Sequence, residues 1–344
     1  MSQLIRNTLV KLPGPIVPRR FYASKPYEVF NRSVKLTQRD HMAQLSKSEN
    51  VEYLRDQAAL KTIERLAFIK RRMPKVLDLG CHSGNFELAL CDKAEDASLE
   101  QDRQLVRDKI DEILMVDGSD KMLHRWDDED YNRELKVNKI VVDEEKLNHP
   151  LLKKNEFDAV ISNLSLHWIN ELPQTLVKIN NLLKPDGLFL ASMICEDSIF
   201  ELRTSLQLAE LERKNGISMG RISPMIKVDD MTNLLKQAKF NMVTIDVEEI
   251  IINYPNIFTI MEDLQLMGEN SANKISNDIL SKEVLLSAQA IYEKFHGEYD
   301  DVSGKTYLPL TFRLMFMIGW KESSNQPKPL ERGSGDINLK DILQ

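Results

Sequence analysis

The chain has 344 residues, of which 42% are apolar and 29% charged, and its formal net charge is −7 at neutral pH. This size and composition are typical of one α/β core with insertions, and the negative charge argues against nucleic-acid binding through phosphate contacts. The three cysteines, Cys81, Cys91 and Cys195, have no paired spacing, so neither a disulfide framework nor a zinc site is expected. The apolar runs fall well short of the ~20 residues that span a bilayer, so no transmembrane helix is expected.

The first 27 residues differ from the rest in composition. They contain five basic residues and several Ser, Thr and Pro residues, and the first acid is Glu28. Basic, acid-free segments of this kind are typical of matrix-targeting presequences, and Arg20-Phe21-Tyr22-Ala23 is a candidate processing site. We therefore expect import into the mitochondrial matrix; a disordered basic arm is the alternative interpretation.

The following residues alternate between helical and strand-like patterns. Apolar residues recur at helical spacing through 30–72, and Pro74 ends that segment. Because strands that alternate with helices form βαβ units, a parallel sheet is expected. Buried-type strands are predicted at 76–79, 112–116, 137–142, 157–161 and 188–194, with helices at 86–110 and 172–183 and a turn at 184–187.

This alternation changes after Cys195. A helix at 200–214 and a Gly-containing loop come before the next predicted helix, 229–238, and strands at 243–252 and 311–320 enclose a helical segment. The pattern predicts a seven-stranded, Rossmann-like α/β sheet with two helical cap insertions. The expected organisation is a targeting segment at 1–27, a core at 28–196 continued at 227–253 and 309–322, a first cap at 197–226, a second cap at 254–308 and a mobile tail at 323–344.

Ligands of such sheets bind beyond the carboxyl ends of the strands. Glycines there let the backbone approach a ligand, a carboxylate after the second strand can accept two ribose hydroxyls, and an acid after the third can accept an adenine amine. The candidate cofactor-binding residues are Asp78, Gly80, Gly84, Asp117, Met122, Asp143, Glu144 and Asn163. The pattern Asp78-x-Gly80-x-x-x-Gly84 is not the dinucleotide fingerprint, and it resembles the first motif of class I methyltransferases. This resemblance implies that the cofactor is S-adenosylmethionine.

His82 occupies the position of the middle glycine in that motif. Histidine adopts a positive φ less readily than glycine, so we expect a reshaped loop. A Rossmann-like fold whose cofactor site no longer functions is the alternative.

Longer motifs resemble the mitochondrial arginine hydroxylases of complex I assembly, over about residues 30–335. The motifs after Cys195 are the more specific ones. The resemblance is carried by Phe30-Asn31-Arg32, Ser162-Asn163-Leu164-Ser165-Leu166-His167-Trp168, Glu201-Leu202-Arg203, Asn253-Tyr254-Pro255, Met261-Glu262-Asp263-Leu264-Gln265 and Met317-Ile318-Gly319-Trp320-Lys321.

The resemblance implies that the chain hydroxylates an arginine on the iron–sulfur subunit of complex I that carries the terminal cluster. It implies a matrix location, with peripheral contact to the inner membrane allowed, and a small accessory assembly protein as a further candidate partner. Two alternatives stay open: an S-adenosylmethionine-dependent methyltransferase with a carboxylate or protein substrate, and a non-catalytic assembly chaperone.

The second cap distinguishes the arginine-hydroxylase hypothesis from a methyltransferase that acts on a carboxylate. The malonyl carrier-protein methyltransferase resembles Met-Arg-x-Leu-Lys where this chain has Met261-Glu262-Asp263-Leu264-Gln265. Carboxylates pair with guanidinium groups, so Glu262 and Asp263 are candidate substrate-binding residues. The alternative is a solvated helix face.

The first cap and the fourth strand add further candidates. Glu201 and Arg203 of the first cap are predicted to contact the substrate, and His167 and Glu201 are the candidate catalytic residues. No metal site is predicted, because the His-x-Glu pattern at His296 and Glu298 lacks the later histidine of an iron site.

Overall fold

The computed structural model describes residues 28–93, 96–218, 220–275, 279–302, 304–327 and 333. The predicted targeting segment at 1–27 and most of the predicted tail lie outside these residues. No helix within the described ranges has both the length and the apolar character needed to cross a bilayer.

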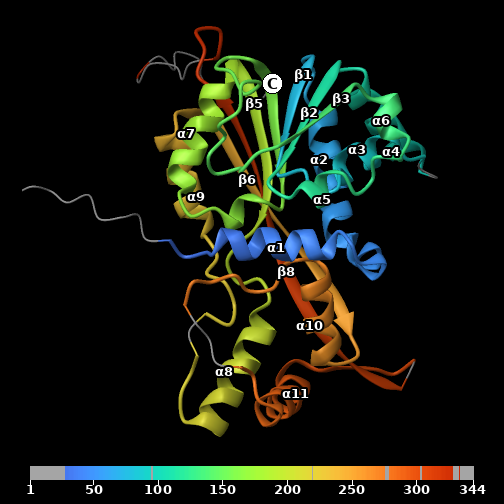
Figure 1. Ribbon diagram of the computed structural model, residues 1–344, viewed down its shortest axis with the longest axis vertical. Coiled ribbons are helices and arrows are strands. Elements are labelled where there is room, and N and C mark those ends of the chain that lie inside the picture. Colours follow the sequence, from blue (N-terminus) through green and yellow to red (C-terminus); the bar gives the residue numbers. More distant parts are fainter. Residues whose placement is uncertain are drawn as a thin grey trace, which may run out of the picture.

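The core is a mixed sheet in the order β3-β2-β1-β4-β5-β8-β6 (Figure 1). Strands β1 to β5 run parallel to one another, whereas β8 runs antiparallel between β5 and β6. The predicted α/β sheet is therefore confirmed. The strands are β1 (Lys75–Leu79), β2 (Glu112–Asp117), β3 (Val137–Val141), β4 (Phe157–Asn163), β5 (Leu183–Ile194), β6 (Phe240–Tyr254), β7 (Glu298–Asp300) and β8 (Lys305–Lys321).

The seven predicted strands form this order, and the described residues add an eighth, β7, which pairs with β8 alone. β8 begins at Lys305, before the predicted start at residue 311, and its extra residues pair with β7. β7 is short, and Glu298 and Tyr299 are exposed, so it shows no apolar alternation that could reveal a strand in the sequence. The turn predicted at 184–187 lies within β5, beside a register shift against β4.

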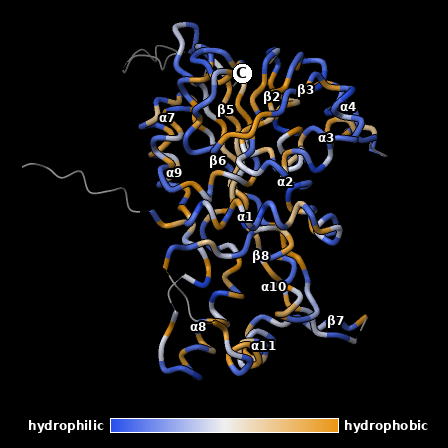
Figure 2. Tube along the Cα trace, in the orientation of Figure 1, coloured by the Kyte–Doolittle hydropathy of each residue, from blue (hydrophilic) through white to orange (hydrophobic). Residues whose placement is uncertain are grey.

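Helices cover both faces of the sheet. One apolar cluster packs α2 to α4 against one face, and another packs α7 and α9 against the opposite face. In Figure 2, apolar residues accordingly gather in the central strands between these layers. The core helices are α2 (Tyr53–Ala67), α3 (Asn85–Cys91), α4 (Ala97–Arg107), α5 (Asp120–Leu123), α6 (Tyr131–Glu134), α7 (Leu172–Leu182) and α9 (Val228–Gln237), with 3-10 turns η1 (Ser46–Val51) and η2 (Leu166–Trp168).

The cap insertions form a second apolar core beyond the carboxyl ends of the parallel strands. It is built from α8 (Phe200–Lys214), α10 (Ile257–Leu266) and α11 (Lys282–His296), packed on the outer ends of β6 and β8. Phe312 of β8 lies within this second core and is 1% exposed. The two long strands thus extend from the sheet into the cap (Figure 1).

One helix crosses between the sheet and the cap. α1 (Arg32–Met42) begins at Asn31, whose side chain accepts a hydrogen bond from the backbone N–H of Val34. The residues just before it pair with the second cap, because the N–H of Asn31 donates to the carbonyl of Ala272 at 2.6 Å. α1 therefore lies over the edge of the sheet where the sequence places a ligand (Figure 1).

Candidate functional site

Three residues with left-handed backbone shape the loop after β1. Their φ values are 68° for Gly80, 54° for His82 and 93° for Gly84. A Cβ added to Gly80 would lie 2.1 Å from Ser165 Oγ, and one added to Gly84 would lie 2.7 Å from Tyr131 Oη. Both positions therefore require glycine for the packing of the chain itself, as well as for any approach of a ligand.

His82 keeps its unusual conformation through two hydrogen bonds. Its backbone N–H donates to Asp117 Oδ2 at 3.1 Å, and its Nε2 lies 3.1 Å from the carbonyl oxygen of Leu164. The side chain is 2% exposed, and burial lowers the pKa of its imidazole well below the ordinary value, so the ring is neutral. The loop thus forms the turn of the motif with an imidazole in place of the glycine.

Three of the four predicted cofactor carboxylates meet at the sheet edge, and α1 binds each of these three. Asp143 accepts a hydrogen bond from Arg32 at 2.9 Å, and Arg32 also contacts Glu144. Arg39 donates to Glu144 Oε1 at 2.8 Å and lies 3.6 Å from Asp117 Oδ1. Asp117 is fully buried and Glu144 is 1% exposed. The acids expected to bind ribose and adenine are therefore neutralised by the chain's own arginines.

The remaining predicted cofactor residues are also engaged within the fold. Asn163 Oδ1 accepts hydrogen bonds from Thr62 and Ser192, and the sulfur of Met122 accepts one from Ser83 at 2.9 Å. Asp78 is 1% exposed and faces Glu87 of α3.

The residue types at this edge fit S-adenosylmethionine, but the available space does not. A Cβ added to Gly118 would meet the side chain of Leu36 at 2.8 Å, so α1 packs directly against the loop after β2. Arg39 lies between Asp117 and Glu144, where a ligand would have to place its ribose. In this conformation α1 occupies the predicted cofactor site.

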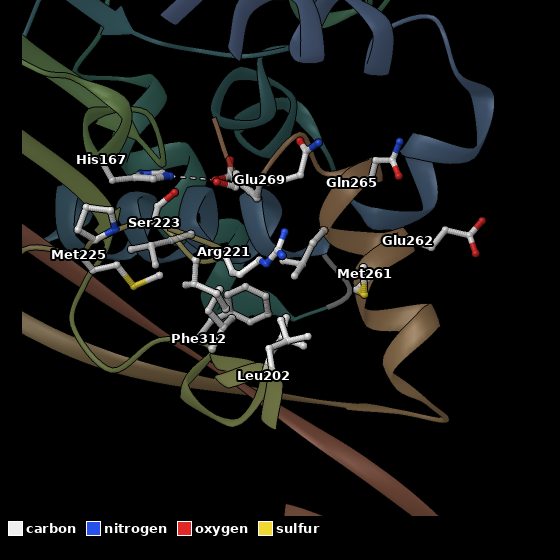
Figure 3. A pocket seen from close by; sticks show the side chains of 18 of the residues that line it. His167, Leu202, Arg221, Ser223, Met225, Met261, Glu262, Gln265, Glu269 and Phe312 are labelled. Atoms are coloured by element: carbon white, nitrogen blue, oxygen red, sulfur yellow. Dashed lines mark hydrogen bonds and ion pairs between the residues drawn. The ribbon is translucent and has the colours of Figure 1, made fainter. Parts of the chain in front are cut away.

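A cavity of about 520 Å³ lies next to this edge, between the core and the caps (Figure 3). Its walls are largely apolar and come from α8, α10, the end of β5, β8 and the loop at 221–225. Apolar wall residues include Ile194, Leu202, Leu206, Phe258, Met261 and Phe312. Partly open clefts of this size and character are typical of small-molecule or side-chain binding.

One group of polar residues in the cavity wall consists of His167, Trp168 and Glu269. The two aromatic residues follow β4, and Glu269 follows α10. Glu269 Oε2 lies 3.0 Å from His167 Nε2 and accepts a hydrogen bond from Trp168 Nε1 at 2.9 Å. His167 therefore lines the cavity, with its ring oriented by a carboxylate (Figure 3).

Residues 51–245 match the family model of a methyltransferase domain. The arginine hydroxylase NDUFAF5 of Danio rerio mitochondria is 36% identical to this chain, over 94% of the chain and 92% of that protein. The Homo sapiens protein of the same name is 34% identical, over 95% of the chain and 87% of that protein. This chain belongs to the NDUFAF5 arginine-hydroxylase family.

The fold of this NDUFAF5-family chain is accordingly that of a methyltransferase domain, and the predicted recognition is confirmed. The predicted mitochondrial location agrees with the names of these relatives. The malonyl carrier-protein O-methyltransferase of Methylovorus is more distant, being 26% identical over 78% of the chain and 82% of that protein.

The predicted substrate residues of this NDUFAF5-family chain do not gather in the cavity. Glu201 is 3% exposed and accepts hydrogen bonds from the N–H and hydroxyl of Thr311 in β8. Arg203 contacts the carbonyl of Ser198 outside the cavity wall. Asp263 accepts a hydrogen bond from Tyr53 at 3.2 Å. These three side chains connect parts of the fold.

Glu262 is the one predicted substrate acid that lines the cavity. Its side chain is 62% exposed and points away from the interior, with Lys47 4.0 Å away (Figure 3). It therefore lies at the mouth of the cavity and not at its polar inner end.

Sequence reasoning missed the residues that dominate both sites, namely Arg32, Lys35, Arg39 and Glu269. The three cations are three and four residues apart, which places them on one face of a helix. This spacing could have indicated a cationic helix face that pairs with the acids of the sheet edge. Glu269 follows Gly268, a helix-ending residue, but nothing local indicates that it folds back toward His167.

Proposed function

We propose that this chain hydroxylates an arginine side chain of a mitochondrial protein, namely the iron–sulfur subunit of complex I that carries the terminal cluster. Family membership over almost the whole chain supports the reaction class. The observation that carries the choice of substrate is the apolar cavity with an ionised carboxylate at its inner end. The aliphatic stem of an arginine suits such walls, and its guanidinium suits such an end.

His167 is the proposed proton acceptor in this cavity. Its Nε2 is held by Glu269, while its Nδ1 is buried without a hydrogen-bond partner among the described residues. A ring fixed in this way can take a proton at one defined nitrogen when the substrate is bound. The redox part of the reaction requires an oxygen source and a reductant that these side chains do not supply.

S-adenosylmethionine is the proposed ligand of the sheet edge after α1 has moved away from it. Asp117, Asp143 and Glu144 are the residue types that would hold its ribose and adenine. When bound, this cofactor carries an activated methyl group, and the present proposal concerns its binding alone. A second candidate function, a non-catalytic assembly chaperone, is favoured by the same contact of α1 with the cofactor acids.

The experiment is mass spectrometry of the iron–sulfur subunit from mitochondria that lack this gene, complemented with the wild type or with His167→Ala. We expect the wild type to restore one added oxygen on an arginine, and His167→Ala to lower the modified fraction by about a hundred-fold or more. Complex I assembly is measured in parallel. If His167→Ala restores complex I assembly but not the arginine modification, the chain catalyses the modification through His167. The assembly role is then separate from catalysis. Modification that persists without the gene would reject the proposed function.

A further inference from the structure

Glu269 is held in place by the end of α10. The backbone N–H of Gly268 donates to the carbonyl of Gln265, and that of Glu269 donates to the carbonyl of Leu264. Gly268 has a φ of 73°, so this is a Schellman turn in which only glycine fits without strain. The turn ends the helix and directs the next side chain back toward His167. Glu269 is therefore positioned by backbone geometry, independently of any ligand.

The carboxylate of Glu269 is ionised and has one oxygen left for a ligand. Burial alone would raise its pKa, but His167, Lys35 and Arg55 together lower the pKa below its ordinary range. Oε2 receives both hydrogen bonds, from His167 and from Trp168. Oε1 receives none from the residues that the structure describes. The side chain is 8% exposed, and it lines the cavity.

Two neighbouring cations do not compete directly for this oxygen. Lys35 donates to the carbonyls of Gly268 and Asn270, each at 2.8 Å, and its Nζ lies 3.4 Å from the centre of the Trp168 ring. Burial lowers the pKa of Lys35 to about 7, so it carries only part of a charge near neutral pH. Arg221 in the cavity wall is bound to the buried Glu210 at 2.8 Å.

We propose that Glu269 recognises the guanidinium of the substrate arginine and so determines the specificity of the cavity. The aliphatic part of the arginine would lie along Leu206, Phe258 and Phe312, and its N–H groups would donate to Glu269. This inference rests on the proposed function. A neutral side chain of the same shape, such as citrulline, would leave the carboxylate without a cation, so the cavity selects for charge as well as length.

The test is calorimetric binding of two probes to the full chain: N-acetyl-arginine amide and N-acetyl-citrulline amide. We expect the wild type to prefer the arginine probe by about ten-fold or more, as for a charged hydrogen bond in a buried site. Glu269→Gln should weaken arginine binding about ten-fold to a hundred-fold and leave citrulline binding unchanged. Gln retains an oxygen that can accept the hydrogen bond from Trp168, so the fold is expected to persist.

Two further variants control this result. Glu283→Gln removes an exposed carboxylate on α11, outside the cavity, and should change neither affinity. Met261→Trp adds bulk to the cavity wall and should weaken both probes. If Met261→Trp leaves both affinities unchanged, the probes bind elsewhere and the inference fails.

The outcomes separate this inference from the proposed function. Equal affinity of the wild type for the two probes, or a preference retained in Glu269→Gln, would overturn the role of Glu269 even if an arginine is modified in mitochondria. Conversely, a preference lost in Glu269→Gln supports the inference even if the iron–sulfur subunit is not the substrate. Because the wild-type preference requires no variant, the charge requirement is tested even if Glu269→Gln does not fold.

Discussion

Asp78 and Glu87 show how one residue of the cofactor motif is used inside the fold. Both side chains are buried, at 1% and 0% exposure, and neither Glu87 oxygen nor Asp78 Oδ1 has a hydrogen-bond partner among the described residues. One of the two must therefore carry a proton. Burial raises the pKa of Glu87 to about 7 and that of Asp78 well above its ordinary value.

This pair predicts a stability that depends on pH. The pKa of Glu87 is higher in the folded state than in the unfolded state. The contribution of its proton to the free energy of unfolding is therefore fully present below about pH 4.5 and is lost as pH rises through about 7. At pH 8 the free energy of unfolding of Glu87→Gln should therefore exceed that of the wild type by about 2–3 kcal/mol, and at pH 5 the variant should show no gain in stability. Denaturant unfolding at the two pH values measures this difference.

Glu112 provides the control for that measurement. Lys136 and Lys75 lower the pKa of Glu112, so Glu112→Gln should lose stability above about pH 4.5, the opposite sign. A gain for Glu87→Gln that is the same at pH 5 and pH 8 would show that burial does not raise the pKa of Glu87.

At the scale of elements, α1 covers the sheet edge where the cofactor is predicted to bind. Its cations pair with acids that lie more than a hundred residues further along the chain, from Arg32 to Asp143 and from Arg39 to Glu144. Arg39 is 3% exposed, and Asp117 and Glu144 raise the pKa of its guanidinium despite the burial. Breaking such a buried pair from one side leaves an unpaired charge.

We predict opposite effects of Arg39→Ala on stability and on ligand binding. The variant should be less stable by about 3–5 kcal/mol, because Glu144 and Asp117 lose their buried cation. It should bind S-adenosylmethionine more tightly than the wild type, because the competing guanidinium is removed. Adding Asp117→Ala should then weaken that binding by about 1–3 kcal/mol. Calorimetry measures the affinities, and chemical denaturation measures the stabilities.

Arg65→Ala is the matched control, since Arg65 pairs with Asp246 and Glu248 on β6, away from this edge. It should leave affinity for S-adenosylmethionine unchanged. If Arg39→Ala binds no more tightly than the wild type, α1 is not what limits access to the site.

The limits of sequence-based prediction follow from these same contacts. The strands and the acids at their ends could be predicted, because apolar runs and turn residues are local patterns. The roles of Glu201 and Asp263 could not, since both carboxylates are engaged by residues distant in sequence, Thr311 and Tyr53. The position of α1 over the sheet edge could not be predicted for the same reason. Each cation looks like an ordinary residue of a solvated helix until its partner is placed.

For the whole molecule, the paired strands β6 and β8 make the core and the cap one structural unit. Their pairing runs from Phe240 opposite Lys321 in the core to Tyr254 opposite Leu308 in the cap. Glu201 adds a further link, because it lies in the first turn of α8 and accepts a hydrogen bond from Thr311 of β8. Within the described residues these contacts join the two parts, so neither part is expected to unfold alone.

We therefore expect one cooperative transition in differential scanning calorimetry. Phe312→Ala, which removes a fully packed ring from the cap core, should lower stability by about 3–5 kcal/mol and retain the single transition. Two resolved heat-absorption peaks in that scan would show that the two parts unfold independently.

The position of β8 also has a consequence for how the chain reaches its folded state. Although it is formed by late residues, β8 occupies an interior place in the sheet, between β5 and β6. A chain that is threaded through a membrane pore with its first residues leading would deliver this strand near the end of transit. Until then β5 and β6 would present unpaired edges, which are templates for aggregation. Until residue 321 has arrived, β5 and β6 therefore lack the partner that both strands share in the folded sheet.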